Sequence, residues 1–253
     1  MMIHIVRIEK PKELTDEVVK QKTELYKKDN TKTVWKEKYI QEALMAMSYH
    51  KCCYCECLLD EESKYMEIEH FHDKSTYPDE VVIWDNLLPS CKKCNTTKGT
   101  HDTKAYPIIN PAIDYPQKHM ILYKGVRFRE KDKLGEMTIT ALNLNDQERH
   151  CMPRYKLMIV VTQKIEDMYE TSEEYLCGQK KQTPQGLGRL RNNVLSLLSL
   201  GKKEKEYSSI VATAIMNDPY YAKLESNMKK LNSWNQDMTD IAKELSEIKY
   251  DEQ

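Results

Sequence analysis

Two Cys-x-x-Cys pairs constrain the fold of this chain more than any other feature of its 253 residues. Cys52 and Cys55 form the first pair, and Cys91 and Cys94 form the second, with residues 56–90 between them. Each pair can occupy a tight turn that points two thiolates at one tetrahedral ion, and four thiolates complete a structural zinc site with no open position. The sequence therefore predicts a zinc centre that joins two distant segments and encloses an element of its own between them.

The first pair lies in the run KCCYCEC, which offers more sulfurs than one zinc site needs. Cys57 could also supply a ligand, together with either Cys53 or Cys55. We favour Cys52 with Cys55 because their spacing matches that of the second pair. The two isolated cysteines farther along the chain are interpreted as ordinary buried residues.

Charge and hydropathy restrict the class of protein only partly. The formal net charge is -1, from 39 Lys and Arg against 40 Asp and Glu, so there is no global basic field but room for local patches. No apolar run approaches the roughly 20 residues that span a bilayer, and MMIHIVRIEKPKEL lacks the apolar centre of a secretory signal. We expect a cytoplasmic protein without membrane contact, in which clustered cysteines favour metal binding over disulfides.

The motifs between about Tyr49 and Thr103 occur in the order CCYC, IEHFHDKS and WDNLLPSCKKCNTTKG. This arrangement resembles a zinc-stapled HNH endonuclease of the ββα-metal family. In that family a strand carries an acidic metal ligand followed by a general-base His, a loop carries an Asn that orients the base, and a short helix carries a second metal ligand. The resemblance places these roles on Glu69, His70, Asn86 and Asn95, which makes the chain an HNN variant.

The chemistry of these side chains agrees with the roles that the resemblance implies. Phosphodiester hydrolysis needs a base that takes a proton from water, and an imidazole such as His70, with an ordinary pKa near 6.5, suits this task at neutral pH. The carboxylate of Glu69 and the amide oxygen of Asn95 suit Mg²⁺ or Mn²⁺ better than thiolates do. A hydrogen bond from Asn86 could fix the tautomer of the imidazole. Zinc would then maintain the fold, and the second metal would take part in the reaction.

Basic residues around the second Cys pair are candidates for contact with nucleic acid. Lys98 would lie one turn after Asn95 on the short helix, where it could contact the scissile phosphate, and Lys92 and Lys93 lie close by. Each of these residues, taken alone, could equally be an ordinary solvated side chain. His72 is not counted as catalytic, because relatives vary at its position.

The sequence also bears on functions other than that of a nuclease. A zinc-dependent nucleobase deaminase needs a His-x-Glu motif, and no His here is followed two residues later by Glu. No GxxxxGK[ST] motif is present, so any dependence on ATP would come from another protein. The remaining alternative is a non-catalytic zinc module that binds nucleic acid or a partner protein, with His70 in a structural role.

The periodicities predict an α+β chain with four parts. These are an N-terminal segment with helices (residues 1–48), the zinc-stapled ββα core (49–105), a connector with short strands (106–144) and a helical C-terminal lobe (145–253). We expect helices over 13–28, 34–50, 146–169, 187–198, 203–216 and 220–250, capped at Thr15 and Asn145 in the first and third cases, and strands over 65–71, 87–90, 119–123, 126–129 and 137–140. The last helix carries the seam Leu231, Trp234, Met238, Ile241, Leu245 and Ile248, which we expect to pack within its own domain, with a partner surface as the alternative.

The outer motifs narrow the resemblance further. MIHIVRIEKP before the core, and TITALNLNDQERHCMPR at the opening of the helical half, look like the HNH subunit of Septu-type bacterial antiphage systems, which also occurs beside some retrons. The resemblance implies a partner ATPase of the ABC or SMC-like class that restrains cleavage until infection. It implies DNA as the target, or tRNA in the retron-linked relatives.

Overall fold

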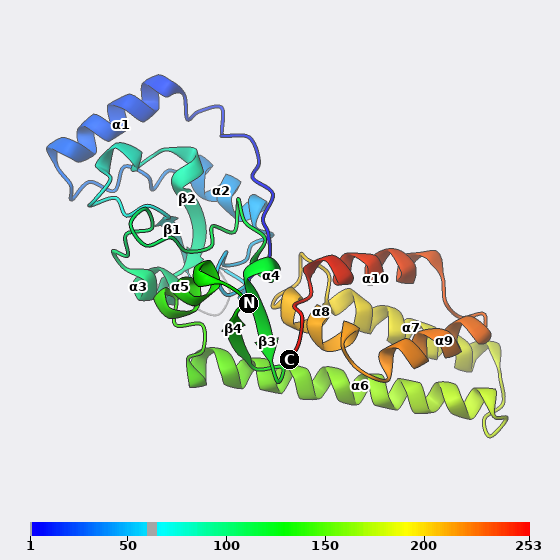
Figure 1. Cartoon of the computed structure of the whole chain (residues 1–253). Helices are drawn as coiled ribbons and strands as arrows, with labels where there is room; N and C mark the ends of the chain where they lie inside the picture. The colour runs from blue at the N-terminus through cyan, green and yellow to red at the C-terminus, as the bar shows by residue number, and fades with distance from the viewer. Residues whose placement is uncertain (1, 60–64) are drawn as a thin grey trace. The chain divides into compact units, whose positions relative to one another are not determined.

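The computed structural model describes residues 2–59 and 65–253 (Figure 1). The chain forms two compact units: unit 1 consists of Met1–Met120 with Arg129–Leu144, and unit 2 of Ile121–Phe128 with Asn145–Gln253. Most elements are helices and the two sheets have two strands each, which confirms the α+β class. Within the described ranges, no helix combines the length and apolar character that crossing a membrane requires.

Two helices open unit 1. Helix α1 (Asp16–Lys28) begins at Thr15, whose hydroxyl accepts a hydrogen bond from the Val18 N–H, as the sequence predicted. Acidic residues in its first turn and lysines in its last turn complement the helix dipole. Helix α2 (Lys38–Met47) delivers the chain into the first Cys pair, and it buries Ile40, Leu44, Met45 and Met47.

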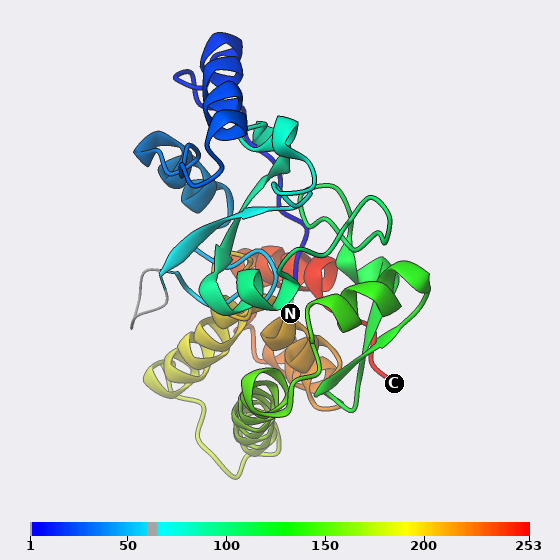
Figure 2. The same ribbon diagram turned by 90° about the vertical axis from the view of Figure 1, so that its left-hand side faces the viewer.

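A hairpin and a short helix form the centre of unit 1. Strands β1 (Met66–His70) and β2 (Leu87–Cys91) pair antiparallel, with Glu69 opposite Leu88. They run alongside each other in both views of the ribbon (Figures 1 and 2). Helix α3 (Lys92–Lys98) follows β2 without a break and contacts both strands. The connection between the strands contains two single-turn 3₁₀ helices, Pro78–Glu80 and Trp84–Asn86.

The connector begins with α4 (Pro116–His119), β3 (Met120–Tyr123) and β4 (Arg127–Glu130), which confirms two predicted strands. The third strand, predicted over 137–140, is wrong: these residues lie in helix α5 (Lys133–Ala141). The β-branched run favours a strand locally, but Asp132 caps the helix and the Thr138 hydroxyl bonds the Leu134 carbonyl one turn back.

Unit 2 is helical apart from its share of the β3–β4 hairpin. A short π-helix (Gln147–Cys151) leads into α6 (Met152–Leu176), α7 (Pro184–Leu200) and α8 (Ser208–Met216). Helix α8 is buried along nearly all its length and contacts α6 and α7. The cap predicted at Asn145 lies one residue later, at Asp146, whose Oδ1 accepts from the Arg149 N–H. The Asn145 side chain instead bonds the N–H and the carbonyl of Phe128.

The single helix predicted over 220–250 is two helices, α9 (Tyr221–Lys230) and α10 (Gln236–Ile248). Asn232 takes a left-handed conformation between them, and Asn235 caps α10 by accepting from the Met238 N–H. The residues of the predicted seam nevertheless pack in the core of unit 2, as expected. Leu231, Met238 and Leu245 are buried, and Trp234, Ile241 and Ile248 pack against the same cluster.

The last residues of the chain pair with β3. The Leu122 N–H donates to the Asp251 carbonyl at 2.9 Å, and the Gln253 N–H donates back to the Leu122 carbonyl at 3.1 Å. The Lys124 N–H continues this parallel pairing by donating to the carbonyl of Gln253 at 3.0 Å. Segments more than a hundred residues apart in sequence therefore share one small sheet edge within unit 2.

Candidate active site and metal centre

The four predicted thiol ligands converge in unit 1. The Sγ atoms of Cys52, Cys55, Cys91 and Cys94 lie within 4.8 Å of one another, and all four residues are buried. Cys55 Sγ and Cys91 Sγ are 3.8 Å apart. A tetrahedral zinc with Zn–S bonds of about 2.3 Å separates its sulfurs by about 3.8 Å, whereas a disulfide would bring them to about 2 Å. The group can hold a metal such as zinc, and it pairs the cysteines as the sequence predicted.

Local hydrogen bonds shape the two turns that carry these thiols. The Cys53 N–H donates to the Pro89 carbonyl at 2.9 Å, which ties the first turn to β2. Cys91 caps α3, and its sulfur accepts from the Cys94 N–H at 3.5 Å. Cys53 and Cys57 are buried beside the site but lie outside the group of four. The extra cysteines of KCCYCEC are therefore neighbours of the centre.

His70 ends β1 and is buried, with 6% of its surface exposed. Its Nε2 lies 2.9 Å from the Val81 carbonyl, a contact that requires the proton on Nε2 and leaves the lone pair on Nδ1. The ring meets Trp35 edge-on, with the centroids 4.8 Å apart. Burial, followed by the positive charge of Lys74, lowers the pKa of His70 to about 4. The imidazole is therefore neutral at pH 7, but it is a weaker proton acceptor than the histidine of ordinary pKa that the sequence analysis assumed.

Glu69, the residue before His70, forms a buried ion pair. Its Oε1 lies 2.7 Å from Lys98 Nζ, and both side chains are about 1% exposed. The Tyr54 hydroxyl donates to the same oxygen at 3.3 Å, and Lys98 also donates to the His70 carbonyl at 3.0 Å. Burial raises the pKa of Glu69 to about 7, against the opposing effect of Lys98.

This ion pair corrects the expectation that Lys98 contacts the scissile phosphate. Lys98 lies in the last turn of α3, where the helix packs against β1, so its ammonium is directed at Glu69 inside the protein. A buried ammonium paired with a carboxylate neutralises that carboxylate. Lys98 therefore supports the strand that carries Glu69 and His70.

Asn95 lies one turn earlier on α3 and faces the same strand. Its Nδ2 donates to Glu67 Oε2 at 2.5 Å, which leaves Oδ1 free of hydrogen bonds among the described residues. Glu67 and Glu69 share one face of β1 because side chains alternate along a strand. The Glu67 carboxylate and the Asn95 amide thus meet between β1 and α3, on the face of β1 that also carries Glu69, and oxygen donors of this kind suit Mg²⁺ or Mn²⁺. The donor chemistry fits such an ion, which would share the Glu69 carboxylate with Lys98.

Asn86 acts on the backbone, which corrects the predicted bond to the imidazole. Its Oδ1 accepts from the His72 N–H at 2.7 Å, and its Nδ2 donates to the carbonyls of His72 at 3.0 Å and Glu80 at 3.1 Å. The Phe71 N–H donates to the Asn86 carbonyl, so the ladder continues past β1 and sets the Asn86 side chain opposite residue 72. Because Glu80 precedes Val81, the Asn86 amide holds the loop whose carbonyl binds the His70 ring.

The His72 ring forms a hydrogen bond with Thr103. The Thr103 hydroxyl donates to the Phe71 carbonyl at 2.9 Å, so the contact of 2.6 Å between His72 Nδ1 and Thr103 Oγ1 places the proton on Nδ1. This bond anchors the segment after α3 to the segment after β1.

Sequence analysis missed Trp35, Tyr54 and Lys74 as parts of this site. Trp35 comes from the connection between α1 and α2, and Tyr54 from inside the first Cys turn. Trp35 precedes every motif and Tyr54 occupies the variable part of the CCYC motif, so only the fold brings them to His70 and Glu69. Lys74 was visible within EIEHFHDKS, but nothing in the pattern distinguished it from the other lysines.

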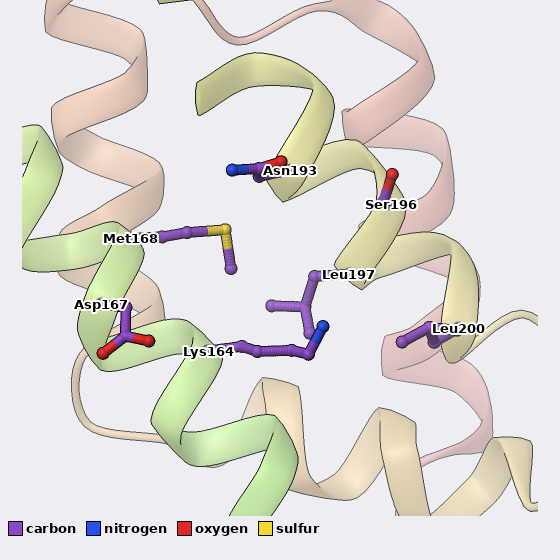
Figure 3. Close-up of a pocket in the computed structure, with 7 residues that line it drawn as sticks. All are labelled: Lys164, Asp167, Met168, Asn193, Ser196, Leu197 and Leu200. Atoms are coloured by element: carbon purple, nitrogen blue, oxygen red, sulfur yellow. The ribbon is translucent and has the colours of Figure 1, made fainter. Parts of the chain in front are cut away.

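Unit 2 contains a groove of a different character between α6 and α7 (Figure 3). Its volume is about 420 Å³, and Met168 and Leu197 point into it from the two helices. The remaining lining residues are Lys164, Asp167, Asn193, Ser196 and Leu200. The residues named for this lining include no imidazole or thiol.

Comparison with known proteins places the chain in a family. No family model matches the chain. A protein of Bacillus thuringiensis named Septu protein PtuB is 40% identical over 238 residues, which cover 92% of this chain and 90% of that protein. The chain belongs to the Septu PtuB family. A second PtuB, from Bacillus mycoides (strain KBAB4), is 29% identical over 45% of this chain and 49% of its own length. The PtuB match confirms the resemblance to the Septu system that the outer motifs predicted.

Proposed function

We propose that this PtuB-family chain is a metal-dependent endonuclease of the HNH type, with DNA as its substrate. One observation carries the proposal: a strand bearing Glu69 and His70 packs against a helix bearing Asn95, directly beside the four-cysteine centre. This is the order strand, strand, helix of a ββα-metal core. Zinc on the four thiolates would hold the two ends of that core together.

His70 is the proposed general base. Its Nδ1 carries the lone pair, because Nε2 donates to the Val81 carbonyl. In hydrolysis, Nδ1 would take a proton from the attacking water as the water oxygen bonds to phosphorus and the bond from phosphorus to the leaving oxygen breaks. Asn86 contributes by holding residues 72 and 80, and so keeps the Val81 carbonyl in place.

Glu69 and Asn95 are the proposed ligands of the catalytic Mg²⁺ or Mn²⁺. An ion bound there would polarise the phosphate and stabilise the charge on the leaving oxygen. Glu69 must be ionised to hold it, and burial raises the pKa of Glu69 to about 7. Lys98 favours the ionised form and would offset part of the cost of keeping this carboxylate charged inside the protein.

The family supports a biological setting for this activity. Two relatives bear the name Septu protein PtuB, and we infer that the chain is the effector nuclease of a bacterial antiphage complex that acts in the cytoplasm. An ATPase of the ABC or SMC-like class is the proposed partner, as the resemblance to the Septu system implies. The seam predicted over residues 231–248 packs in the core of unit 2. The exposed faces of the helices are therefore the proposed contact surface for the ATPase.

A second candidate function rests on the burial of His70. With 6% of its surface exposed and Trp35 against its ring, His70 could be a structural residue of a non-catalytic zinc module. Such a module would bind nucleic acid or the partner without cleaving anything. The two candidates differ in whether removal of the imidazole affects a reaction.

The deciding experiment is a cleavage assay with plasmid DNA and, in parallel, a tRNA pool. Parent protein and His70→Ala are compared with and without the ATPase encoded beside the gene, in Mg²⁺, Mn²⁺ and EDTA. We expect cleavage that requires both a divalent ion and His70, while the variant retains its zinc and a cooperative melting transition, at a lower temperature because it loses the bond to the Val81 carbonyl. Binding of nucleic acid without cleavage in any combination would favour the non-catalytic module.

A further inference from the structure

Lys74 is a cation beside the candidate base. Its Nζ lies 5.2 Å from the centroid of the Trp35 ring, within the range of a cation–π interaction. The same indole contacts the His70 imidazole, with the centroids 4.8 Å apart. One aromatic ring therefore holds an ammonium and the imidazole of the proposed base.

Lys74 forms no close ion pair with the residues that the structure describes. Within the described ranges, no carboxylate lies within 4.0 Å of its Nζ, whereas Lys98 is paired with Glu69 and Lys104 with Glu80. The adjacent carboxylate of Asp73 is turned to the backbone: its Oδ2 accepts from the N–H groups of residues 75 and 76, at 3.1 and 3.0 Å. The ammonium of this half-buried lysine, held beside a reaction centre without a close ion pair among the described residues, can receive an external anion.

The N-terminal helices fix the ring that holds Lys74. Trp35 lies between α1 and α2 and is buried, and Tyr26 of α1 packs edge-on against it with the centroids 5.8 Å apart. Lys22 of α1 pairs with Glu37 just after Trp35. The segment before the zinc-stapled core thus contributes a side chain to the site.

We propose that Lys74, seated on Trp35, binds the phosphate of the nucleic acid beside His70, in the role that the sequence suggested for Lys98. The inference rests on the proposed function and adds a substrate-binding cation to it. Trp35 acts as a positioning residue, because it holds the Lys74 ammonium without touching the phosphate. The N-terminal helices are then part of the substrate site.

The test measures binding, so that it is independent of cleavage. Full-length protein carrying His70→Ala is titrated with fluorescent duplex DNA, single-stranded DNA and tRNA over a range of salt concentrations. The variants Lys74→Met and Lys74→Arg are compared with Lys20→Met, which removes an exposed lysine of α1. Zinc content and melting temperature are measured for each variant.

A lost phosphate contact weakens binding of every sequence and flattens its salt dependence. We expect Lys74→Met to reduce the slope of log K against log salt by about 0.9 for duplex DNA, or about 0.7 for single strands. Lys74→Arg should keep the slope, and Lys20→Met should not change it. An unchanged slope and affinity in Lys74→Met would overturn the role of Lys74 and leave the nuclease proposal standing. Failure of the parent to bind any of the three probes would overturn both.

Trp35 has its own pair of variants. Trp35→Phe keeps an aromatic face under the ammonium, and Trp35→Leu removes it while remaining apolar. We expect Trp35→Leu to lose the same part of the salt slope as Lys74→Met, and Trp35→Phe to retain most of it. In the Lys74→Met background, Trp35→Leu should remove nothing further. A further flattening of the slope there would show that Trp35 acts independently of Lys74.

Discussion

The ammonium of Lys98 lies 2.7 Å from the carboxylate of Glu69, and neither side chain reaches solvent to any significant extent. Each charge depends on the other, because an isolated ion in the protein interior has lost its hydration without compensation. The pair therefore links α3 to β1 beside the candidate base. It also couples the stability of unit 1 to the protonation of Glu69.

Removal of one partner of this pair should be costly. We expect Lys98→Met to lower the free energy of unfolding by about 3–5 kcal/mol at pH 8, because Glu69, whose pKa Lys98 holds down, must then either stay buried as an unpaired ion or take up a proton on folding. The double variant Glu69→Gln, Lys98→Met should recover much of that loss. Urea denaturation of the parent and the two variants measures these differences, and equal stability of parent and Lys98→Met would contradict the importance of the pair.

The zinc assignment separates the six clustered cysteines into ligands and neighbours. Cys91→Ser should lose the bound zinc and much of its solubility, because metal binding and folding are coupled in such sites. Cys57→Ser should retain one zinc per chain. Metal analysis of the purified Cys91→Ser and Cys57→Ser variants tests this assignment. Loss of zinc in Cys57→Ser would show that Cys57 is a ligand, as in the alternative pairing.

His70 should remain neutral well below the pH at which a free imidazole is protonated. Its pKa is lowered from 6.5 to about 4, chiefly by burial. Below pH 6.5 the imidazole binds a proton in the unfolded chain but not in the folded protein. The contribution of neutral His70 to the free energy of unfolding is therefore fully present above pH 6.5 and is lost as the pH falls toward 4. The full effect is on the order of 3 kcal/mol. Imidazole resonances of His70 that stay constant from pH 7.5 to 5 would agree with this, and a midpoint near 6.5 would contradict it.

Asn86 should matter through the backbone that it holds. Asn86→Ala removes one acceptor and two donors, and it leaves the His72 N–H without its partner. We expect a loss of about 1–3 kcal/mol in stability and faster exchange of the His72 amide hydrogen. Asn86→Asp keeps the acceptor, so it should protect that amide while it still loses the two donated bonds. Hydrogen exchange of the His72 amide in both variants tests this role, and equal exchange rates in parent and Asn86→Ala would exclude it.

The parts of the fold that follow from local pattern were predictable. The Cys-x-x-Cys spacing led to the group of four thiols that could hold a metal, the alternation around Ile68 led to β1, and the polar residue before α1 led to its cap. The strand expected near Thr138 failed because β-branched residues favour strands on average, while here a cap and a side-chain hydrogen bond stabilise a helix. The long C-terminal helix failed because the seam continues across a left-handed residue, Asn232, that the hydrophobic pattern does not reveal.

The candidate site was predictable in its members but not in their contacts. Glu69 and His70 are neighbours in sequence, so a motif can identify them. The partners of Asn86 and Lys98 depend on how the loop 71–86 and the helix α3 close over β1, which is a tertiary property. Trp35 reaches His70 from a segment that precedes the motif altogether, and its contribution becomes visible only in the folded chain.

The pairing of residues 251–253 with β3 imposes an order in time on assembly. During translation at about 5–20 residues per second, the segment 121–128 emerges several seconds before the strand that completes its edge. Every residue of unit 1, including the thiolates and His70, has been synthesised by residue 144. The nascent chain can therefore form its metal centre before residues 251–253 are available to pair with β3, and unit 2 is completed last.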